Sequence, residues 1–288
     1  MERQGGKAAL LFFWTHLCSR GFCCSPLHAQ MDKKIQYYKT LSDDVIDNGD
    51  LDYKLPDDYC FIRNDFLHRL NSALVYGLVC AIGFAYCKLV LRVSIKNRKI
   101  LRDYAQSGYF VYANHTQPFG DVVLPAFLSL RKRIYTIVSP ANMNLPFIGK
   151  ILPALGAIPI PSGIKQMKQF LDAVKERVQQ GHCVVIYPEA HVWPYYTKIR
   201  PFPITSFRFP VETQSPVFAM TTTYRKSRWC KRPKTTVYLD GPFIPDDGLS
   251  KKEQQHQLHQ LVFDAMKKRC ECSTYEYIGY QKKEESQS

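Results

Sequence analysis

Short runs of apolar, β-branched and aromatic residues recur from residue 109 onward, with amphipathic segments between several of them. These runs predict strands at Tyr109–Ala113, Ile134–Val138, Ala157–Ile160, Cys183–Tyr187, Val217–Thr223 and Thr235–Leu239. Strands that alternate with helical segments are typical of a wound α/β sheet. We therefore expect an α/β fold with a mixed sheet flanked by helices, in which residues 95–280 form one domain.

Two segments have the residue spacing of an amphipathic helix. The first covers residues 164–180 and ends before Gly181, and its expected buried face consists of Ile164, Met167, Leu171, Val174 and Val178. The second begins with the capping box Ser250–Glu253, and its expected apolar stripe consists of Leu258, Leu261, Val262 and Met266. A shorter apolar helix is expected at Val122–Leu130.

A segment with the composition of a membrane-associating helix precedes this domain. The eighteen residues from Leu70 to Cys87 carry no formal charge, and about 20 apolar residues suffice to cross a bilayer. Residues 70–91 therefore fit a spanning helix, a helix lying in the interface or a hydrophobic helix pair, with a buried core helix as the alternative. Six basic residues without an acidic one follow at Lys88, Arg92, Lys96, Arg98, Lys99 and Arg102. This pattern is typical of the cytoplasmic face of a membrane.

The two ends of the chain are expected to stand apart from the domain. The apolar stretch Ala8–Trp14 is too short to span a bilayer, and no clear cleavage site follows it. One hypothesis is that residues 1–30 are a mispredicted extension and that translation starts at Met31. Residues 31–94 then form an N-terminal region, and residues 281–288 form a polar tail.

Composition narrows the class of protein. With 288 residues, 45% hydrophobic and 22% charged, the chain is long and apolar enough for a sizeable core. The net charge of +14 favours an acidic partner such as nucleic acid, an anionic membrane or a phosphorylated small molecule. The basic run 225–234, on an expected hairpin, suits lipid head groups, an acidic carrier protein or CoA phosphates. No nucleic-acid reader module accompanies it, so we expect no nucleic-acid partner.

Metal and disulfide chemistry is not expected. The ten cysteines are scattered, lie partly in apolar runs, and lack the paired spacing of a zinc site. We interpret them as reduced, intracellular thiols. The sequence also lacks the signatures of α/β serine hydrolases, P-loop kinases, dinucleotide-binding dehydrogenases and zincins.

Candidate chemistry lies where two strands are expected to end. The first strand leads into Asn114–Asp121, and ligands of open α/β sheets bind at the carboxyl ends of strands. A histidine such as His115, held by a carboxylate such as Asp121, acts as a general base. The alternative is an aspartate that only caps a helix, next to an unrelated loop histidine. The strand at 183–187 ends in a second acidic residue, Glu189.

The order of these motifs resembles the 1-acylglycerol-3-phosphate acyltransferase family of glycerolipid acyltransferases. The resemblance covers about residues 85–245 and rests on Asn114–Asp121, Pro146–Gly149, Leu155–Pro159, Tyr187–Glu189, Arg200–Phe202 and Ser215–Val217. The chain looks like a divergent member of this family, which implies a glycerolipid-acyltransferase-like fold.

The resemblance also implies a reaction. His115 would remove a proton from an acceptor hydroxyl, which then attacks the thioester of acyl-CoA or acyl-carrier protein, and Asp121 would orient the histidine. The resemblance further implies substrate-binding positions at Asn114, Glu189, Pro146 and Gly149. No metal or cofactor is needed, because the thioester already carries a good leaving group.

The chain departs from the family pattern near the acceptor. Five residues instead of four separate His115 from Asp121, and Ala190 replaces a glycine. Pro161 and Pro203 stand where the family has basic residues that recognise the acceptor phosphate. Lys198 and Arg200 could supply positive charge from the same connection, or be solvated loop charges.

The expected function is acyl transfer to a lysophospholipid such as 1-acylglycerol-3-phosphate, in phospholipid biosynthesis and at the cytoplasmic face of a membrane. Acyl transfer to an acceptor without phosphate is one alternative. A non-catalytic lipid- or membrane-binding protein on the same fold is another. No feature of the sequence predicts an oligomeric state.

Overall fold

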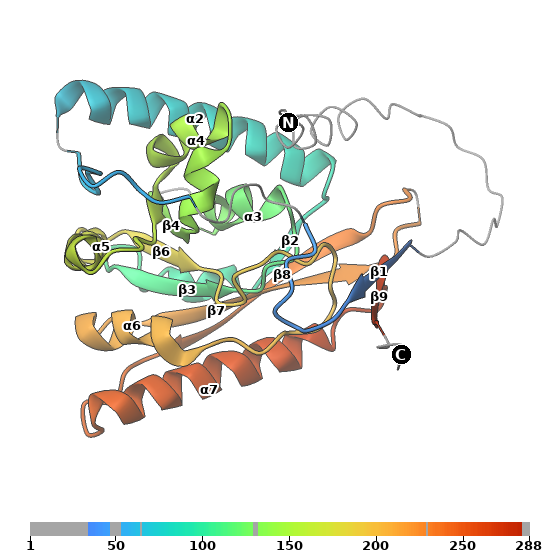
Figure 1. Ribbon diagram of the computed structural model, residues 1–288. Helices are drawn as coiled ribbons and strands as arrows, with labels where there is room; N and C mark the ends of the chain where they lie inside the picture. Colours follow the sequence, from blue (N-terminus) through green and yellow to red (C-terminus); the bar gives the residue numbers. More distant parts are fainter. Residues whose placement is uncertain (1–33, 47–52, 64, 129–131, 229, 284–288) are drawn as a thin grey trace, which may run out of the picture.

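A seven-stranded sheet forms the centre of the computed structural model, which describes residues 34–46, 53–63, 65–128, 132–228 and 230–283 (Figure 1). The strand order is β2-β8-β7-β3-β6-β4-β5. Only the β7–β8 pair is antiparallel. The strands are β2 (Ser94–Lys96), β3 (Tyr109–Ala113), β4 (Ile134–Val138), β5 (Ala157–Pro159), β6 (Cys183–Ile186), β7 (Val217–Arg225) and β8 (Lys234–Phe243). The predicted mixed α/β sheet is therefore confirmed, and β2 is a short edge strand that the sequence pattern did not predict.

Helices cover both faces of this sheet (Figure 1). One face packs on α5 (Ile164–Gln179), α6 (Arg208–Thr213) and α7 (Lys251–Cys270), and the other on α2 (Phe66–Leu89), α3 (Gly120–Val123) and η2 (Leu124–Phe127). The remaining short helices are η1 (Arg98–Leu101), η3 (Pro140–Asn144), α4 (Ile148–Ile151), η4 (Leu152–Leu155) and η5 (Ile204–Phe207). Along β3 the side chains alternate between the two cores, as the pleat requires, so the strand is buried throughout.

The amphipathic helices form where they were predicted, with differences in detail. The capping box at Ser250 is present, and Leu258, Val262 and Met266 of α7 are buried. Leu261 is 41% exposed, because the buried residues of this helix follow each other at a spacing of four and Leu261 lies beside that row. The buried face of α5 is also rotated from the predicted one. Phe170 packs at its centre, whereas Ile164, in the first turn, is 94% exposed.

The predicted helix at Val122–Leu130 is divided in the described residues. The α-helix α3 ends at Val123, and the 3₁₀ helix η2 follows it. Pro125 lies in the first turn of η2, where its missing N–H and its ring prevent a continuous α-helix.

The long apolar helix α2 lies along the domain with most of its surface exposed (Figure 1). Only 17% of its most apolar 18-residue window is buried, so the buried-core alternative is wrong. Among the described residues it is the one helix whose length and composition would suffice to cross a membrane. Its inner side contacts the domain through Ser72, which donates a hydrogen bond to Ala154 O, and through Tyr76, which accepts one from Ile134 N.

A second, two-stranded sheet joins the two ends of the described chain. Strand β1 (Lys34–Tyr38) pairs in parallel with β9 (Ile278–Lys282). The sequence pattern predicted neither strand. The hairpin expected at the basic run is present, since Arg225 of β7 pairs with Lys234 of β8. The expectations for residues 1–30, and for the tail beyond residue 283, fall outside the described residues.

Candidate active site

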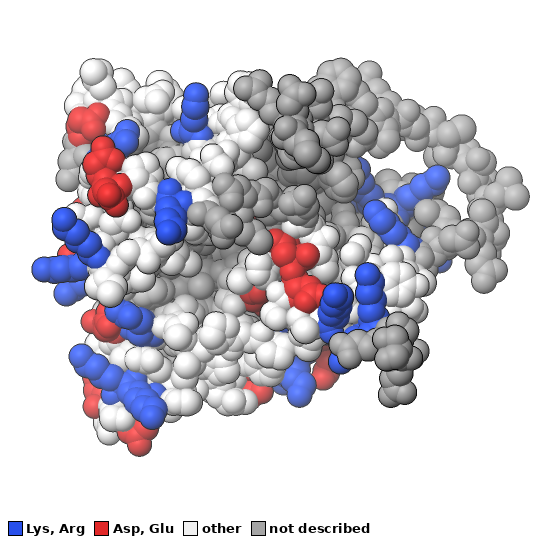
Figure 2. All heavy atoms as spheres, in the orientation of Figure 1, with Lys and Arg blue, Asp and Glu red and all other residues white. Residues whose placement is uncertain are grey.

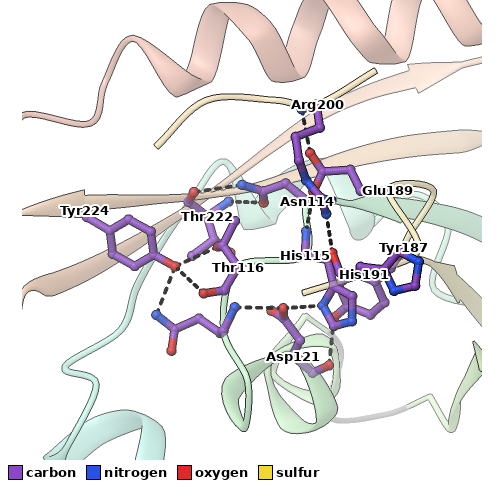
Figure 3. Close-up of polar contacts among 11 residues, drawn as sticks. Asn114, His115, Thr116, Asp121, Tyr187, Glu189, His191, Arg200, Thr222 and Tyr224 are labelled. Atoms are coloured by element: carbon purple, nitrogen blue, oxygen red, sulfur yellow. Dashed lines mark hydrogen bonds and ion pairs between the residues drawn. The ribbon is translucent and has the colours of Figure 1, made fainter. Parts of the chain in front are cut away.

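His115 and Asp121 meet at the carboxyl end of β3 (Figure 3). His115 Nδ1 lies 2.8 Å from Asp121 Oδ2, which also accepts a hydrogen bond from Gln117 N at 2.9 Å. Asp121 sits in the first turn of α3, and its own N–H donates to Gln117 O. This turn brings the two side chains together although five residues, one more than in the family pattern, separate them. The carboxylate is enclosed, whereas 23% of the imidazole is exposed.

Tyr187 supports this pair from the end of β6. Its ring stacks on the His115 imidazole with centroids 4.5 Å apart, and its hydroxyl donates to Asp121 O at 2.7 Å. Burial raises the pKa of Tyr187 well above its ordinary value, so the hydroxyl stays a donor. Burial also raises the pKa of Asp121, and the paired His115 opposes that shift. Tyr187 belongs to the motif Tyr187–Glu189, but the sequence pattern indicated no role for it.

Asn114 ties the end of β3 to β7. Its side-chain NH₂ donates to Thr222 O at 3.1 Å, and its oxygen accepts from Thr222 N at 2.7 Å. The residue is fully buried. The structure therefore gives Asn114 a structural contact in place of the expected substrate contact.

Thr116 and Gln117 are held from the same side by Tyr224 of β7. The Tyr224 hydroxyl lies 2.7 Å from Thr116 Oγ1, and Gln117 Nε2 donates to it at 3.0 Å. The loop that carries His115 is thus anchored to a central strand, and the sequence offered no local signal for these contacts because β7 lies about a hundred residues away.

Glu189 and Arg200 form a buried pair behind His115 (Figure 3). Glu189 Oε2 accepts the main-chain N–H of His115 at 3.0 Å, and Oε1 accepts that of Arg200 at 2.7 Å. The Arg200 guanidinium lies 3.5 Å from Glu189 Oε2, with its side chain 1% exposed. Burial raises the pKa of Glu189, while Arg200 and the two N–H donors oppose the shift. Neither side chain presents the exposed group that acceptor binding was expected to use.

The other predicted substrate-binding residues lie elsewhere. Pro146 is exposed and precedes α4, which packs on η3 and η4. Gly149 is buried within α4, where a Cβ atom would lie 2.1 Å from Met143 O, so the position requires glycine. Lys198 is exposed on the connection that follows β6.

The structure also places the two residues that follow Glu189. Ala190 has a φ of 64°, a conformation that favours glycine. His191 follows it, and its Nδ1 lies 3.1 Å from Asp44 Oδ2 of the N-terminal region.

The described residues include no group of three or more His, Cys, Asp or Glu side chains placed to hold a metal ion. The seven cysteines in the described ranges are free thiols.

Comparisons with known proteins agree with the acyltransferase resemblance and with the α/β fold. Residues 92–223 match the protein-family model described as Acyltransferase. The fold is similar to the crystal structure of the 1-acyl-sn-glycerophosphate (LPA) acyltransferase, PlsC, from Thermotoga maritima, with a TM-score of 0.52 and 19% sequence identity. That similarity covers 73% of this chain and 83% of the other chain. No match was found among curated protein sequences. Residues 92–223, which carry both His115 and Glu189, therefore resemble the Acyltransferase family.

Proposed function

We propose that the protein is a membrane-associated acyltransferase of phospholipid biosynthesis. It moves a fatty acyl chain from a thioester, acyl-CoA or acyl-carrier protein, to a hydroxyl of a lysophospholipid such as 1-acylglycerol-3-phosphate. The observation that carries this proposal is the pairing of a partly exposed His115 with the enclosed Asp121 carboxylate, inside a segment that resembles the Acyltransferase family.

His115 is the general base. Its Nδ1–H donates to Asp121 Oδ2, which leaves the Nε2 lone pair to accept a proton. Nε2 takes the proton of the acceptor hydroxyl while the hydroxyl oxygen forms a bond to the thioester carbonyl carbon. Asp121 stabilises the resulting imidazolium and keeps the ring in the productive orientation.

The same imidazole completes the reaction. When the tetrahedral intermediate collapses, the carbon–sulfur bond breaks and the thiolate leaves with the electron pair. The imidazolium returns its proton to that sulfur. The products are an ester and a free thiol, and His115 regains its starting state.

Helix α2 supports the membrane part of the proposal. Its outer surface exposes Leu67, Leu74, Leu78, Ile82 and Leu89. Its inner side is held to the domain from Ser72 to Cys87, so the exposed leucines can enter a bilayer interface while the domain stays beside it.

The basic hairpin lies at the end of α2. Arg92 Nη1 donates to Ser227 Oγ at 2.6 Å and Nη2 to Arg232 O at 2.9 Å, which holds the hairpin beside the end of that helix. Figure 2 shows blue side chains gathered near the end of the β7–β8 hairpin, on the right of the view. Such a charge cluster next to an apolar helix favours anionic lipid on a cytoplasmic membrane face.

One observation favours each of the two kinds of acceptor head group. A phosphate acceptor is favoured by the fold shared with the Thermotoga maritima protein, whose description names 1-acyl-sn-glycerophosphate. An acceptor without phosphate is favoured by the burial of Arg200, because a buried guanidinium is not available to a phosphate. Of the two basic residues predicted to contact the acceptor, Lys198 is the exposed one.

The test is transfer of labelled acyl groups from acyl-CoA and from acyl-carrier protein to lysophosphatidic acid and to phosphate-free lysolipids. We expect product with the wild type and almost none with His115→Ala. His256→Ala, on the exposed side of α7, is the matched control and should retain activity. A folded wild type that binds vesicles but transfers to no acceptor would instead favour the non-catalytic lipid-binding alternative.

A further inference from the structure

The main chain of His115 is held on both sides by the connection that follows β6. Its N–H donates to Glu189 Oε2 at 3.0 Å, and its carbonyl accepts from Trp193 N at 2.9 Å. The next carbonyl, of Thr116, accepts from Tyr195 N at 2.8 Å. The position of the imidazole therefore depends on this connection as well as on Asp121.

Both oxygens of the Glu189 carboxylate take part in these contacts. Both of its oxygens accept main-chain N–H groups, from His115 and Arg200, and the Arg200 guanidinium balances its charge. The residue is 6% exposed and Arg200 is 1% exposed. A group with this burial and these partners positions its neighbours, since it presents nothing to a substrate.

Arg200 and Trp193 connect this pair to the N-terminal region. Arg200 Nη1 donates to Leu41 O at 3.3 Å, and its guanidinium lies over the Trp193 ring at 4.8 Å. Trp193 Nε1 donates to Asp43 O at 2.8 Å. These acceptors are main-chain carbonyls of a segment that lies outside the family-matched residues 92–223.

The C-terminal region holds the same connection from another side. Tyr280 of β9 stacks on Trp193 with centroids 4.9 Å apart, and its hydroxyl donates to Pro194 O at 2.9 Å. Because β9 pairs with β1, the two terminal regions act on the connection as one small sheet.

We propose that Glu189 and Arg200 are positioning residues for His115, and that a latch made of β1, residues 39–46 and β9 keeps them in place. This inference rests on the proposed function, because it deepens the account of the same site. It differs from the acceptor-binding role that the family resemblance implies for Glu189. A displacement of about 1 Å at a reacting group can cost about 10²-fold in rate, so such a latch has kinetic consequences.

The first test is Glu189→Gln in the full chain. The amide keeps the shape of the side chain but leaves Arg200 without a counter-charge. We expect kcat to fall about 10²-fold while the acceptor KM stays within about twofold. A raised acceptor KM with kcat retained would overturn the proposal, because it is the signature of a residue that binds the acceptor in the ground state.

The second test addresses the latch and does not depend on a buried charge. Tyr280→Phe removes the hydrogen bond to Pro194 O and keeps the stacking on Trp193. We expect a severalfold lower kcat with the acceptor KM unchanged. Tyr196→Phe is the matched control, since Tyr196 also contacts Trp193 and Tyr280 by its ring but has no hydroxyl hydrogen bond in the described structure. Equal kcat values in the two variants would overturn the latch.

A third measurement separates this proposal from the proposed function. The imidazole ¹⁵N resonances of His115 are assigned by their loss in His115→Ala and are compared between wild type and Glu189→Gln. We expect them to move or broaden in the variant. If the wild type transfers no acyl group, the proposed function fails, but this comparison still decides the positioning role, and unchanged His115 resonances would overturn it.

Discussion

His115 and Asp121 differ sharply in exposure although their side chains lie 2.8 Å apart: 23% of the imidazole is exposed but only 2% of the carboxylate. In the proposed reaction the aspartate therefore acts through the histidine, and the histidine is the member of the pair that is exposed to a bound hydroxyl. This difference in exposure supports the proposed assignment of Asp121 as the orienting group and His115 as the reacting group. The contact between the two side chains also argues against the alternative in which the aspartate only caps a helix beside an unrelated histidine.

Asp121→Asn is expected to lower kcat by about 10²-fold or more, because the amide can donate to Nδ1 and select the wrong imidazole tautomer. His115→Ala is expected to cost about 10²–10⁴-fold, the usual contribution of a general base. Steady-state kinetics with a labelled thioester would measure both. Asp172→Asn, exposed on α5, is the control. Wild-type rates in Asp121→Asn would contradict the orienting role.

Charged residues on the outer side of α2 are expected to weaken membrane binding. Each Leu side chain removed from water contributes about 1.5–3 kcal/mol, so Leu74→Lys with Leu78→Lys should reduce vesicle affinity at least about tenfold. Co-sedimentation with vesicles that contain anionic lipid would measure it. Leu261→Lys provides the control, because α7 lies across the sheet from α2 (Figure 1). Equal binding by both variants would argue against α2 as the membrane contact.

The two glycines inside α2 should respond in opposite ways to alanine. Gly77 faces open space, so Gly77→Ala is expected to raise the free energy of unfolding by about 0.5–1 kcal/mol. At Gly83 a Cβ atom would lie 2.7 Å from Val123 Cγ1, and the β-branched valine has little freedom to move. Gly83→Ala is therefore expected to destabilise the contact between α2 and α3. Denaturant titration of both variants would reveal the difference, and equal stabilisation would contradict this close packing.

Stability should decrease in mild acid through His182. Burial, together with Arg177, Arg133 and Lys132, lowers the pKa of His182 below its ordinary value of 6.5. Between the lowered value and 6.5 the unfolded chain binds more protons than the folded protein, so folding weakens as the pH falls through this window. His182→Gln should lose less unfolding free energy than the wild type between about pH 7.5 and about pH 5.5. An unchanged pH dependence in the variant would contradict the assignment.

Features that depend on near neighbours along the chain were predictable from the sequence alone. Strand β3 was predicted with its observed bounds because five consecutive apolar residues suit a strand buried on both faces. The start of α7 was predicted because Ser250 and Glu253 cap it within one turn. The meeting of His115 with Asp121 was also foreseeable, since a short turn joins them.

The effects of distant segments on these elements became known from the three-dimensional structure. Arg200 and Glu189 had been interpreted as groups that face the acceptor, but contacts with residues 41 and 115 enclose them. Strands β1 and β9 gave no usable signal, because each is short and finds its partner more than two hundred residues away. The exposure of α2 likewise depends on which of its sides the sheet covers. Local patterns report the intrinsic preference of a segment, whereas burial and pairing depend on which segments the whole chain brings together.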